Sequence, residues 1–241
     1  MTGVPLRWVA EDHEASCRRA ARMIADAAAP VAGRDAFTLV LSGGSAPRRL
    51  FELLAEGFPA PLPWELVHVF WCDERCVPPD HPESNYGAAR TLLLDHVPIP
   101  PGGVHRMRGE LGPERGAEAY REELTALSPA GPPAFDLALL GLGDDGHTCS
   151  LFPGSPALGS PRAVEPARSP RGIAGRITLT PAGLAGAQRV MFLVAGEGKA
   201  EAVAQTLEGE RPAGEVPARA IRPRGEVVWL LDAAAAADLS G

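Results

Sequence analysis

Short apolar runs alternate along most of the chain with segments of helical periodicity. Each run has the length of a strand and ends in glycine or polar residues; the runs are 37–44, 67–74, 135–143, 189–198 and 226–232. None alternates cleanly between apolar and polar positions, which is typical of strands covered on both faces. Between them the pattern predicts helices over 12–29, 46–56, 84–95, 114–127 and 197–208. The alternation indicates an α/β fold: a doubly wound, largely parallel, Rossmann-like sheet flanked by helices.

The length of 241 residues allows one large α/β domain or two small ones. We expect a single domain over 1–241, with a small subdomain within 75–130 as the alternative. Residues 154–175 are rich in proline, glycine and serine, and they predict a long surface excursion with some mobility.

Charge and composition exclude several classes of partner. The net charge of −7 argues against a general nucleic-acid binder and against an anionic-membrane binder. No apolar run approaches the 18 residues of a membrane span, and the N-terminus lacks the apolar core of a signal peptide. The four cysteines form no disulfide framework. We therefore expect a cytoplasmic protein that binds neither nucleic acid nor membrane.

Polar clusters follow four of the apolar runs directly. They are Ser42–Ser45, Asp73–Arg75, Asp144–His147 and Gly196–Lys199. In an open parallel sheet, ligands bind outside the carboxyl ends of the strands. The four clusters are therefore expected to meet at one edge of the sheet, where they would form a site.

The first cluster, Ser42-Gly43-Gly44-Ser45, is a candidate phosphate loop. Glycines allow close approach of a ligand to the backbone, and the helix that follows offers free N–H groups and partial positive charge. The loop is neither a Walker A nor a GxGxxG motif. The alternative is a tight strand–helix turn with Ser45 as a structural N-cap.

Two cations elsewhere are candidates for the same anion. Lys199 starts a predicted helix and supplies a point charge, whereas Arg176 offers the bidentate fork that suits phosphate oxygens. Each has the alternative interpretation of an ordinary solvated surface side chain.

The stretch "GLGDDGH" is the strongest candidate for acid–base chemistry. Its glycines allow Asp145 and His147 to project together into a crevice. A carboxylate two positions before an imidazole is close enough to orient it and to raise its basicity. Cys149 nearby leaves a Cys–His nucleophile as an alternative. Cys72 and Cys76 have no second ligand pair nearby, so no metal is expected.

Charged residues also crowd the stretch "WCDERCVPPDHPESNYG". Arg75 is interpreted as a donor to substrate oxygens, with Asp73 or Glu74 as its orienting partner. The alternative is an internally paired turn. Ser84 is a candidate N-cap, and either it or Asn85 is expected to face the ligand.

Taken together, these motifs resemble the 6-phosphogluconolactonase family. The resemblance rests on "LSGGSAPRRLFELLA", "DERCVPPDHPESNYG", "GLGDDGHTCSLFP", "RITLTPAGL" and "GEGKAEAV", in the order of that family and over residues 37–232. It implies a cofactor-free hydrolase of the pentose phosphate pathway that converts 6-phospho-D-glucono-1,5-lactone to 6-phosphogluconate. Ala46 and Cys149 depart slightly from the common pattern.

The resemblance also suggests a mechanism. His147, oriented by Asp145, would activate water and later protonate the ring oxygen. Arg75 would contact substrate oxygens. The phosphate would be held by the Ser42–Ser45 loop, Arg176 and Lys199, while Asp73 and Asn85 would complete the substrate site.

Two alternative functions remain at this stage. Related glucosamine-6-phosphate deaminases carry an acidic residue where this chain has Phe152, which argues against deamination. A non-catalytic sugar-phosphate sensor would use the same loops, but the short N-terminus leaves no room for an attached DNA-binding domain. We expect a monomer or a weak homodimer.

Overall fold

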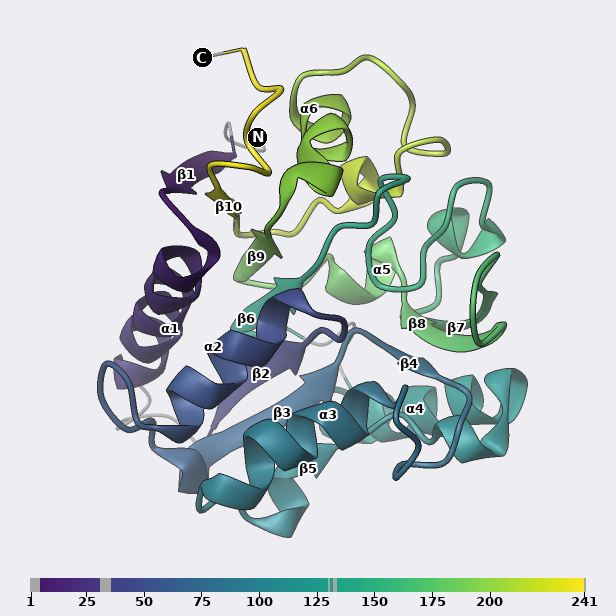
Figure 1. Ribbon diagram of the computed structural model, residues 1–241. Coiled ribbons are helices and arrows are strands. Elements are labelled where there is room, and N and C mark those ends of the chain that lie inside the picture. The colour runs from purple at the N-terminus through teal and green to yellow at the C-terminus, as the bar shows by residue number, and fades with distance from the viewer. Residues whose placement is uncertain (1–4, 31–35, 130, 132–133, 241) are drawn as a thin grey trace.

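A seven-stranded parallel sheet forms the centre of the computed structural model, which describes residues 5–30, 36–129, 131 and 134–240 (Figure 1). The strand order is β1-β10-β9-β6-β2-β3-β5, and every neighbouring pair is parallel. Its strands are β1 (Leu6–Ala10), β2 (Phe37–Leu41), β3 (Val67–Trp71), β5 (Val104–His105), β6 (Leu137–Leu140), β9 (Arg189–Val194) and β10 (Glu226–Asp232). The predicted fold class is confirmed. The first four residues and the last residue of the predicted 1–241 domain lie outside the described part.

The five predicted strands are all present, and the sequence missed the two at the edges. Residues of β2, β3, β6, β9 and β10 are mostly buried, because helices cover both faces. By contrast, β1 has an exposed pattern along its length, and β5 is two residues long. Edge strands lack the continuous apolar run by which a buried parallel strand is identified.

The direction in which the chain winds reverses between β2 and β6. From β2 the chain proceeds outward through β3 to β5, then crosses back to β6 and proceeds the other way through β9 to β10. Such a reversal leaves a crevice at the carboxyl ends of the two central strands. The polar clusters that follow β2 and β6 therefore lie at the crevice.

A second, antiparallel sheet stands beside the first, in the order β4-β8-β7. It consists of β4 (Asp73–Arg75), β7 (Val164–Arg168) and β8 (Gly175–Leu179), and it lies on the right of Figure 1. β4 follows β3 after one residue, so the chain passes directly from one sheet to the other. Residues 154–175 are thus more regular than their composition predicted: they hold a 3₁₀ turn and β7, where Val164 is fully buried.

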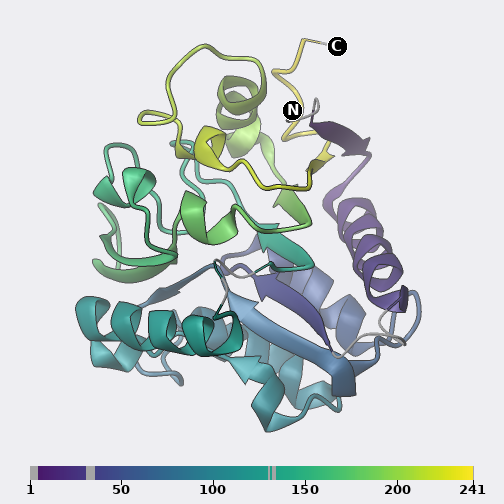
Figure 2. The ribbon, with the colours of Figure 1, turned by 180° about the vertical axis from the view of Figure 1, so that it is seen from behind.

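Helices cover both faces of the large sheet. α1 and α2 lie in front of it in Figure 1, whereas α4 comes to the front in Figure 2. The helices are α1 (His13–Ala28), α2 (Ala46–Ala55), α3 (Asn85–Leu92), α4 (Pro113–Leu127), α5 (Pro181–Leu184) and α6 (Ala200–Leu207). Ser84 caps α3 as predicted, since its side chain accepts a hydrogen bond from the N–H of Gly87. No helix in the described part is long and apolar enough to span a bilayer.

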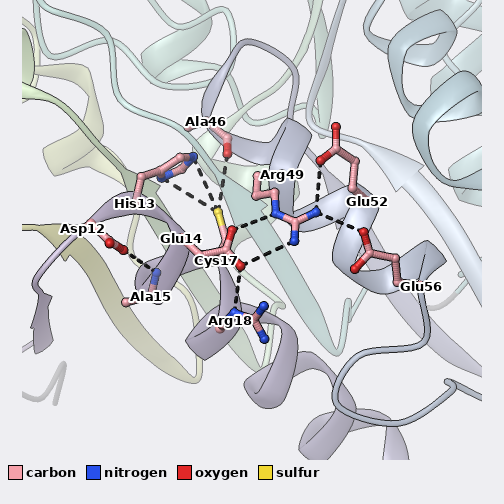
Figure 3. Close-up of polar contacts among 10 residues, drawn as sticks. All are labelled: Asp12, His13, Glu14, Ala15, Cys17, Arg18, Ala46, Arg49, Glu52 and Glu56. Atoms are coloured by element: carbon pink, nitrogen blue, oxygen red, sulfur yellow. Dashed lines mark hydrogen bonds and ion pairs between the residues drawn. The ribbon is translucent and has the colours of Figure 1, made fainter.

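A charged cluster joins α1 to α2 and so holds the helix that follows the Ser42–Ser45 loop (Figure 3). Arg49 donates to both carboxylate oxygens of Glu14, with Nε at 2.7 Å, and also to Glu52 and Glu56 at 3.1 Å. The Cys17 thiol lies 3.9 Å from the carbonyl oxygen of Ala46, the first residue of α2. These contacts fix the start of α2 against α1.

A histidine pair at the β3–β5 edge predicts a pH-dependent stability. His105 Nδ1 lies 2.7 Å from Glu123 Oε1, and its Nε2 lies 2.8 Å from His68 Nδ1. One proton thus bridges the two rings. Burial and, secondarily, the neighbouring His105 lower the pKa of His68 below its ordinary value.

Since the unfolded chain then binds more protons, this contribution to stability is present above about pH 6.5 and is lost as the pH falls. We expect the free energy of unfolding to decrease on acidification, by at most about 1.4 kcal/mol per pH unit for one proton. Urea denaturation at several pH values should give a shallower dependence for His68→Gln. Replacement of the exposed His96 by glutamine is the control. Equal slopes for wild type and His68→Gln would contradict this interpretation.

Candidate active site

The four polar clusters meet, as predicted, around one cavity of about 220 Å³ at the carboxyl ends of the central strands. It is lined from the first cluster by Ser42, Gly43, Gly44 and Ser45, from the second by Asp73 and Arg75, from the third by Gly143 and His147, and from the fourth by Lys199. Asn85 and Arg176 line it as well. Asp145 does not line the cavity but contacts His147.

Asp145 holds His147 in a defined orientation. One oxygen, Oδ1, lies 2.6 Å from Nδ1 of the imidazole and 3.0 Å from the backbone nitrogen of the same residue. Because a carboxylate oxygen only accepts, the contact selects the neutral tautomer that carries its proton on Nδ1 and its lone pair on Nε2. The geometry predicted from the spacing of these two residues is therefore present, and it leaves Nε2 able to accept a proton.

Glycine at position 143 is a steric requirement of this arrangement. A Cβ atom there would stand 1.9 Å from His147 Nδ1 and 2.8 Å from Asp145 Oδ1. The Gly143 N–H also donates to the carbonyl oxygen of His147 at 2.8 Å, and the Thr148 hydroxyl donates to that of Gly141 at 2.8 Å. The loop therefore folds tightly around the imidazole.

The imidazole ring also packs against Phe152. The two ring centroids are 4.6 Å apart, with the ring planes tilted by 39°. An apolar ring in this place adds no proton donor or acceptor beside His147. Asp145 is thus the carboxylate that the loop sets against the imidazole.

The Ser42–Ser45 loop leaves several of its donors available to a ligand. Gly44 has φ +88°, a backbone conformation suited to glycine. Ser45 occupies the N-cap position of α2, but within the described residues its side chain makes no capping hydrogen bond. Pro47 has no N–H, so the free N–H groups at this helix start come from the loop itself and from Ala46. The structural N-cap alternative for the Ser45 hydroxyl therefore has no support.

Arg75 and Arg176 face each other across the antiparallel β4–β8 pair. Like charges directly opposite each other destabilise a sheet, so the pairing indicates that ligand oxygens compensate the two guanidinium charges. Arg75 Nε and Arg176 Nη1 are both buried and have no hydrogen-bond partner among the described residues. Burial, followed by the charge of Arg75, lowers the pKa of Arg176 from its ordinary value. Buried guanidinium nitrogens with unmet hydrogen bonds are well suited to bind oxyanions.

The predicted orienting partner of Arg75 is wrong. Its Nη1 donates to the carbonyl oxygen of Glu83 at 2.7 Å, and neither Asp73 nor Glu74 binds the guanidinium in the described structure. The Glu74 carboxylate instead accepts from the backbone N–H of Arg75. Backbone groups from the 83–86 turn form hydrogen bonds with the side chains of Arg75 and Glu74. The pattern of charges in the sequence does not reveal these backbone partners.

Asp73 and Asn85 form a buried pair at the cavity wall. Asn85 Nδ2 donates to the Asp73 carbonyl oxygen at 2.9 Å and to its Oδ1 at 3.0 Å. The amide oxygen of Asn85 therefore points toward the Ser42–Ser45 loop, where a Cβ on Gly43 would stand 1.8 Å from it. Ser150, which the sequence analysis did not single out, donates to Asp73 Oδ2 at 2.6 Å. Nothing in the local pattern pairs two residues 77 positions apart.

Lys199 lines the cavity from the 3₁₀ turn before α6. Asp144 stands nearby and binds the exposed Arg171 at 2.8 Å. These cations lower the pKa of Asp144, Arg171 more than Lys199. The positive charge of Lys199, Arg75 and Arg176 around one small cavity supplies the local cationic site that a net-acidic chain needs to hold an anion.

The cysteine alternatives gain no support from the geometry. Cys149 is buried, and no hydrogen bond joins it to His147 in the described structure. Contact with the Cys149 thiol and burial raise the pKa of Cys72, and burial raises that of Cys76 to about 11. Across the described residues, no group of three or more His, Cys, Asp or Glu side chains is arranged to hold a metal ion.

Similar proteins are known over nearly the whole chain. Residues 7–229 match the family model of glucosamine-6-phosphate isomerases/6-phosphogluconolactonase. The 6-phosphogluconolactonase of Synechocystis sp. is 45% identical over 213 residues, 87% of this chain and 87% of that protein. That of Rattus norvegicus is 43% identical over 217 residues, 86% of this chain and 82% of the relative. The solved 6-phosphogluconolactonase from Trypanosoma cruzi superposes with a TM-score of 0.86 at 30% identity, covering 100% of this chain and 99% of its own.

Proposed function

Because the chain belongs to the family of glucosamine-6-phosphate isomerases and 6-phosphogluconolactonases, we propose that it hydrolyses 6-phospho-D-glucono-1,5-lactone to 6-phosphogluconate, with His147 as general base and acid. Its curated relatives are 6-phosphogluconolactonases, so the protein is a carboxylic ester hydrolase. The single observation that carries the mechanism is His147, which lines a cavity together with two arginines and is held from behind by Asp145 at 2.6 Å.

In the first step, Nε2 of His147 takes a proton from a water molecule as the water oxygen attacks C1 of the lactone. The imidazolium that forms is stabilised by Asp145 through Nδ1–H. The C1–ring oxygen bond then breaks, and Nε2 returns the proton to the departing ring oxygen. General acid–base help of this kind is worth about 10²- to 10⁴-fold in rate.

The other residues of the site bind and orient the substrate. Arg75 donates to the carbonyl oxygen as it gains negative charge, which lowers the barrier to attack. The Ser42–Ser45 loop, Arg176 and Lys199 bind the phosphate, so that the far end of the substrate fixes C1 beside His147. Asn85, with its amide orientation set by Asp73, accepts a hydrogen bond from a sugar hydroxyl through its amide oxygen, which lies beside the Ser42–Ser45 loop.

Deamination of glucosamine 6-phosphate is the competing reaction within the family. Phe152 stands where the deaminase resemblance requires an acidic residue, and it packs on the imidazole as an apolar ring. A proton relay that needs a second carboxylate has no group at this position. The sensor alternative does not require the ordered imidazole that the loop supplies.

The test is an assay of the purified chain with 6-phospho-D-glucono-1,5-lactone, with spontaneous hydrolysis subtracted. We expect saturable turnover well above background and no ammonia release from glucosamine 6-phosphate. Turnover no faster than background would overturn the proposed function. Ammonia release would favour the deaminase, and tight binding of the lactone without turnover would favour the sensor.

Replacement of Arg176 by glutamine tests the phosphate assignment. A charge-assisted hydrogen bond is worth about 1.5–3 kcal/mol, so kcat/KM is expected to fall by about 10- to 150-fold. The loss should appear mainly in KM, since the phosphate is bound equally in ground and transition states. Because the substitution removes a like-charge pair, Tm should not fall.

The exposed Arg168 on the neighbouring strand β7 provides the matched control. Arg168→Gln removes the same charge from the same small sheet but lies away from the cavity lining, so steady-state kinetics should match wild type. A wild-type KM in Arg176→Gln would refute the assignment.

A further inference from the structure

Glu74 is a buried carboxylate that the catalytic mechanism does not use. It is 2% exposed and does not line the cavity, yet it lies between two residues that do. On the basis of the proposed function, we propose that Glu74 is a positioning residue: it clamps the start of α3 onto β4 and so sets Arg75 and Asn85 relative to each other.

Within the described residues, the carboxylate accepts four hydrogen bonds. Oε1 accepts from the backbone N–H groups of Arg75 and Asn85, both at 2.7 Å. Oε2 accepts from the Ser84 hydroxyl at 3.0 Å and from the Tyr86 N–H at 2.8 Å. Only an ionised carboxylate accepts at both oxygens from two donors each. The site is therefore built for a negative charge.

This clamp joins two elements that each contribute lining residues to the cavity. Arg75 belongs to β4 and Asn85 is the first residue of α3. The Arg75 guanidinium is held in addition by the Glu83 carbonyl oxygen, which belongs to the same turn. A shift of this turn would therefore move both ligand-facing side chains together.

The tolerance for such a shift is small. The Asn85 amide oxygen lies so near Gly43 that even a Cβ atom would stand 1.8 Å from it. If the start of α3 moved toward the Ser42–Ser45 loop, Asn85 would press on the phosphate-binding backbone. Displacement of a positioned group by about 1 Å costs about 10²-fold in rate.

A contribution to folding stability does not by itself explain why a carboxylate is buried at position 74. No lysine or arginine side chain forms an ion pair with Glu74 among the described residues, and the α3 start supplies the compensating partial charge. Burial raises the pKa of Glu74 above its ordinary value, against the lowering effect of the three backbone N–H groups. Buried charges often contribute little net stability. A role in holding the site accounts better for the charge.

Glu74→Gln tests the clamp, because the amide keeps the size but turns its NH₂ toward two donors. We expect kcat/KM to fall by about 10²-fold at a temperature where circular dichroism shows the variant folded. If Glu74→Gln does not fold, Glu74→Asp carries the same test, since it keeps the charge and withdraws the carboxylate by one methylene group.

Ser84→Ala is the matched control. It removes one of the four contacts and the α3 cap, at a cost of about 1 kcal/mol in stability, but it leaves the hold on Arg75 and Asn85. We expect lower Tm with near wild-type kcat/KM. If the activity of the Glu74 and Ser84 variants fell in proportion to their losses of Tm, the role of Glu74 would be merely structural and the proposal would be overturned.

A double-mutant cycle with Arg75→Gln gives a readout that general destabilisation would not move. If Glu74 acts through Arg75, Glu74→Gln should cost much less in the Arg75→Gln background than in wild type. Additive losses would overturn the proposal. An inactive wild type would instead overturn the proposed function, so the two failures are distinguishable.

Discussion

Replacement of His147 by alanine is expected to lower kcat for lactone hydrolysis by about 10²- to 10⁴-fold, with little change in KM. The imidazole is the group whose free lone pair faces the cavity, since its Nδ1 proton is bound by Asp145 at 2.6 Å. Its removal leaves the arginines and the Ser42–Ser45 loop in place. The substrate should therefore still bind, but the water should lose its base and the ring oxygen its acid.

Steady-state kinetics with the spontaneous rate subtracted measures this effect. Asp145→Asn is a useful companion, because an amide nitrogen toward Nδ1 would favour the wrong tautomer and lower kcat without removing the imidazole. His96→Gln controls for the loss of a histidine at an exposed position. Wild-type kcat in His147→Ala would exclude the mechanism while leaving the lactonase activity intact.

Gly143→Ala is expected to lower kcat nearly as much as His147→Ala does, although it removes no functional group. The added Cβ would stand 1.9 Å from His147 Nδ1, a distance that no real contact reaches. The imidazole must therefore rotate away, and its hydrogen bond to Asp145 must break. We expect a loss of about 10²-fold or more in kcat, the cost of misplacing a catalytic group by about 1 Å.

The neighbouring Gly141→Ala provides the control for this steric argument. A Cβ there meets the Ser42 hydroxyl at 3.6 Å, an ordinary van der Waals contact. Its kcat should exceed that of Gly143→Ala by at least about tenfold if displacement by 1 Å costs about 10²-fold. Equal losses in both variants would show that loop backbone freedom, and not the imidazole position, limits the rate.

The sequence predicted the central layers of the fold better than its periphery. Continuous apolar runs identified β2, β3, β6, β9 and β10, because strands covered on both faces are apolar throughout. The sequence pattern did not predict the second sheet, because β7 is partly exposed and lies within a stretch rich in turn-forming residues. Its pairing with β8 and β4 depends on long-range contacts that local composition does not encode.

For the site, the sequence predicted which residues would gather but not how they would pair. The glycine spacing around Asp145 and His147 indicated their contact. Side chains two positions apart in a tight turn can adopt only a few relative orientations. The partners of Arg75 and Asp73 were misjudged or missed: the guanidinium binds the Glu83 carbonyl oxygen, and Ser150 binds the Asp73 carboxylate. Both contacts join segments whose approach depends on the whole sheet.

The amino-acid sequence by itself determined the five buried strands of the large sheet, the Ser42–Ser45 turn and the contact of Asp145 with His147, since short-range sterics and hydrophobic patterning act within a few residues. Tertiary structure alone decided that Arg75 and Arg176 stand opposite each other and that Glu74 binds the start of α3. The physical reason is that strand register and the burial of charge are settled only when distant segments pack. Local propensity selects the elements, whereas the cavity exists only between them.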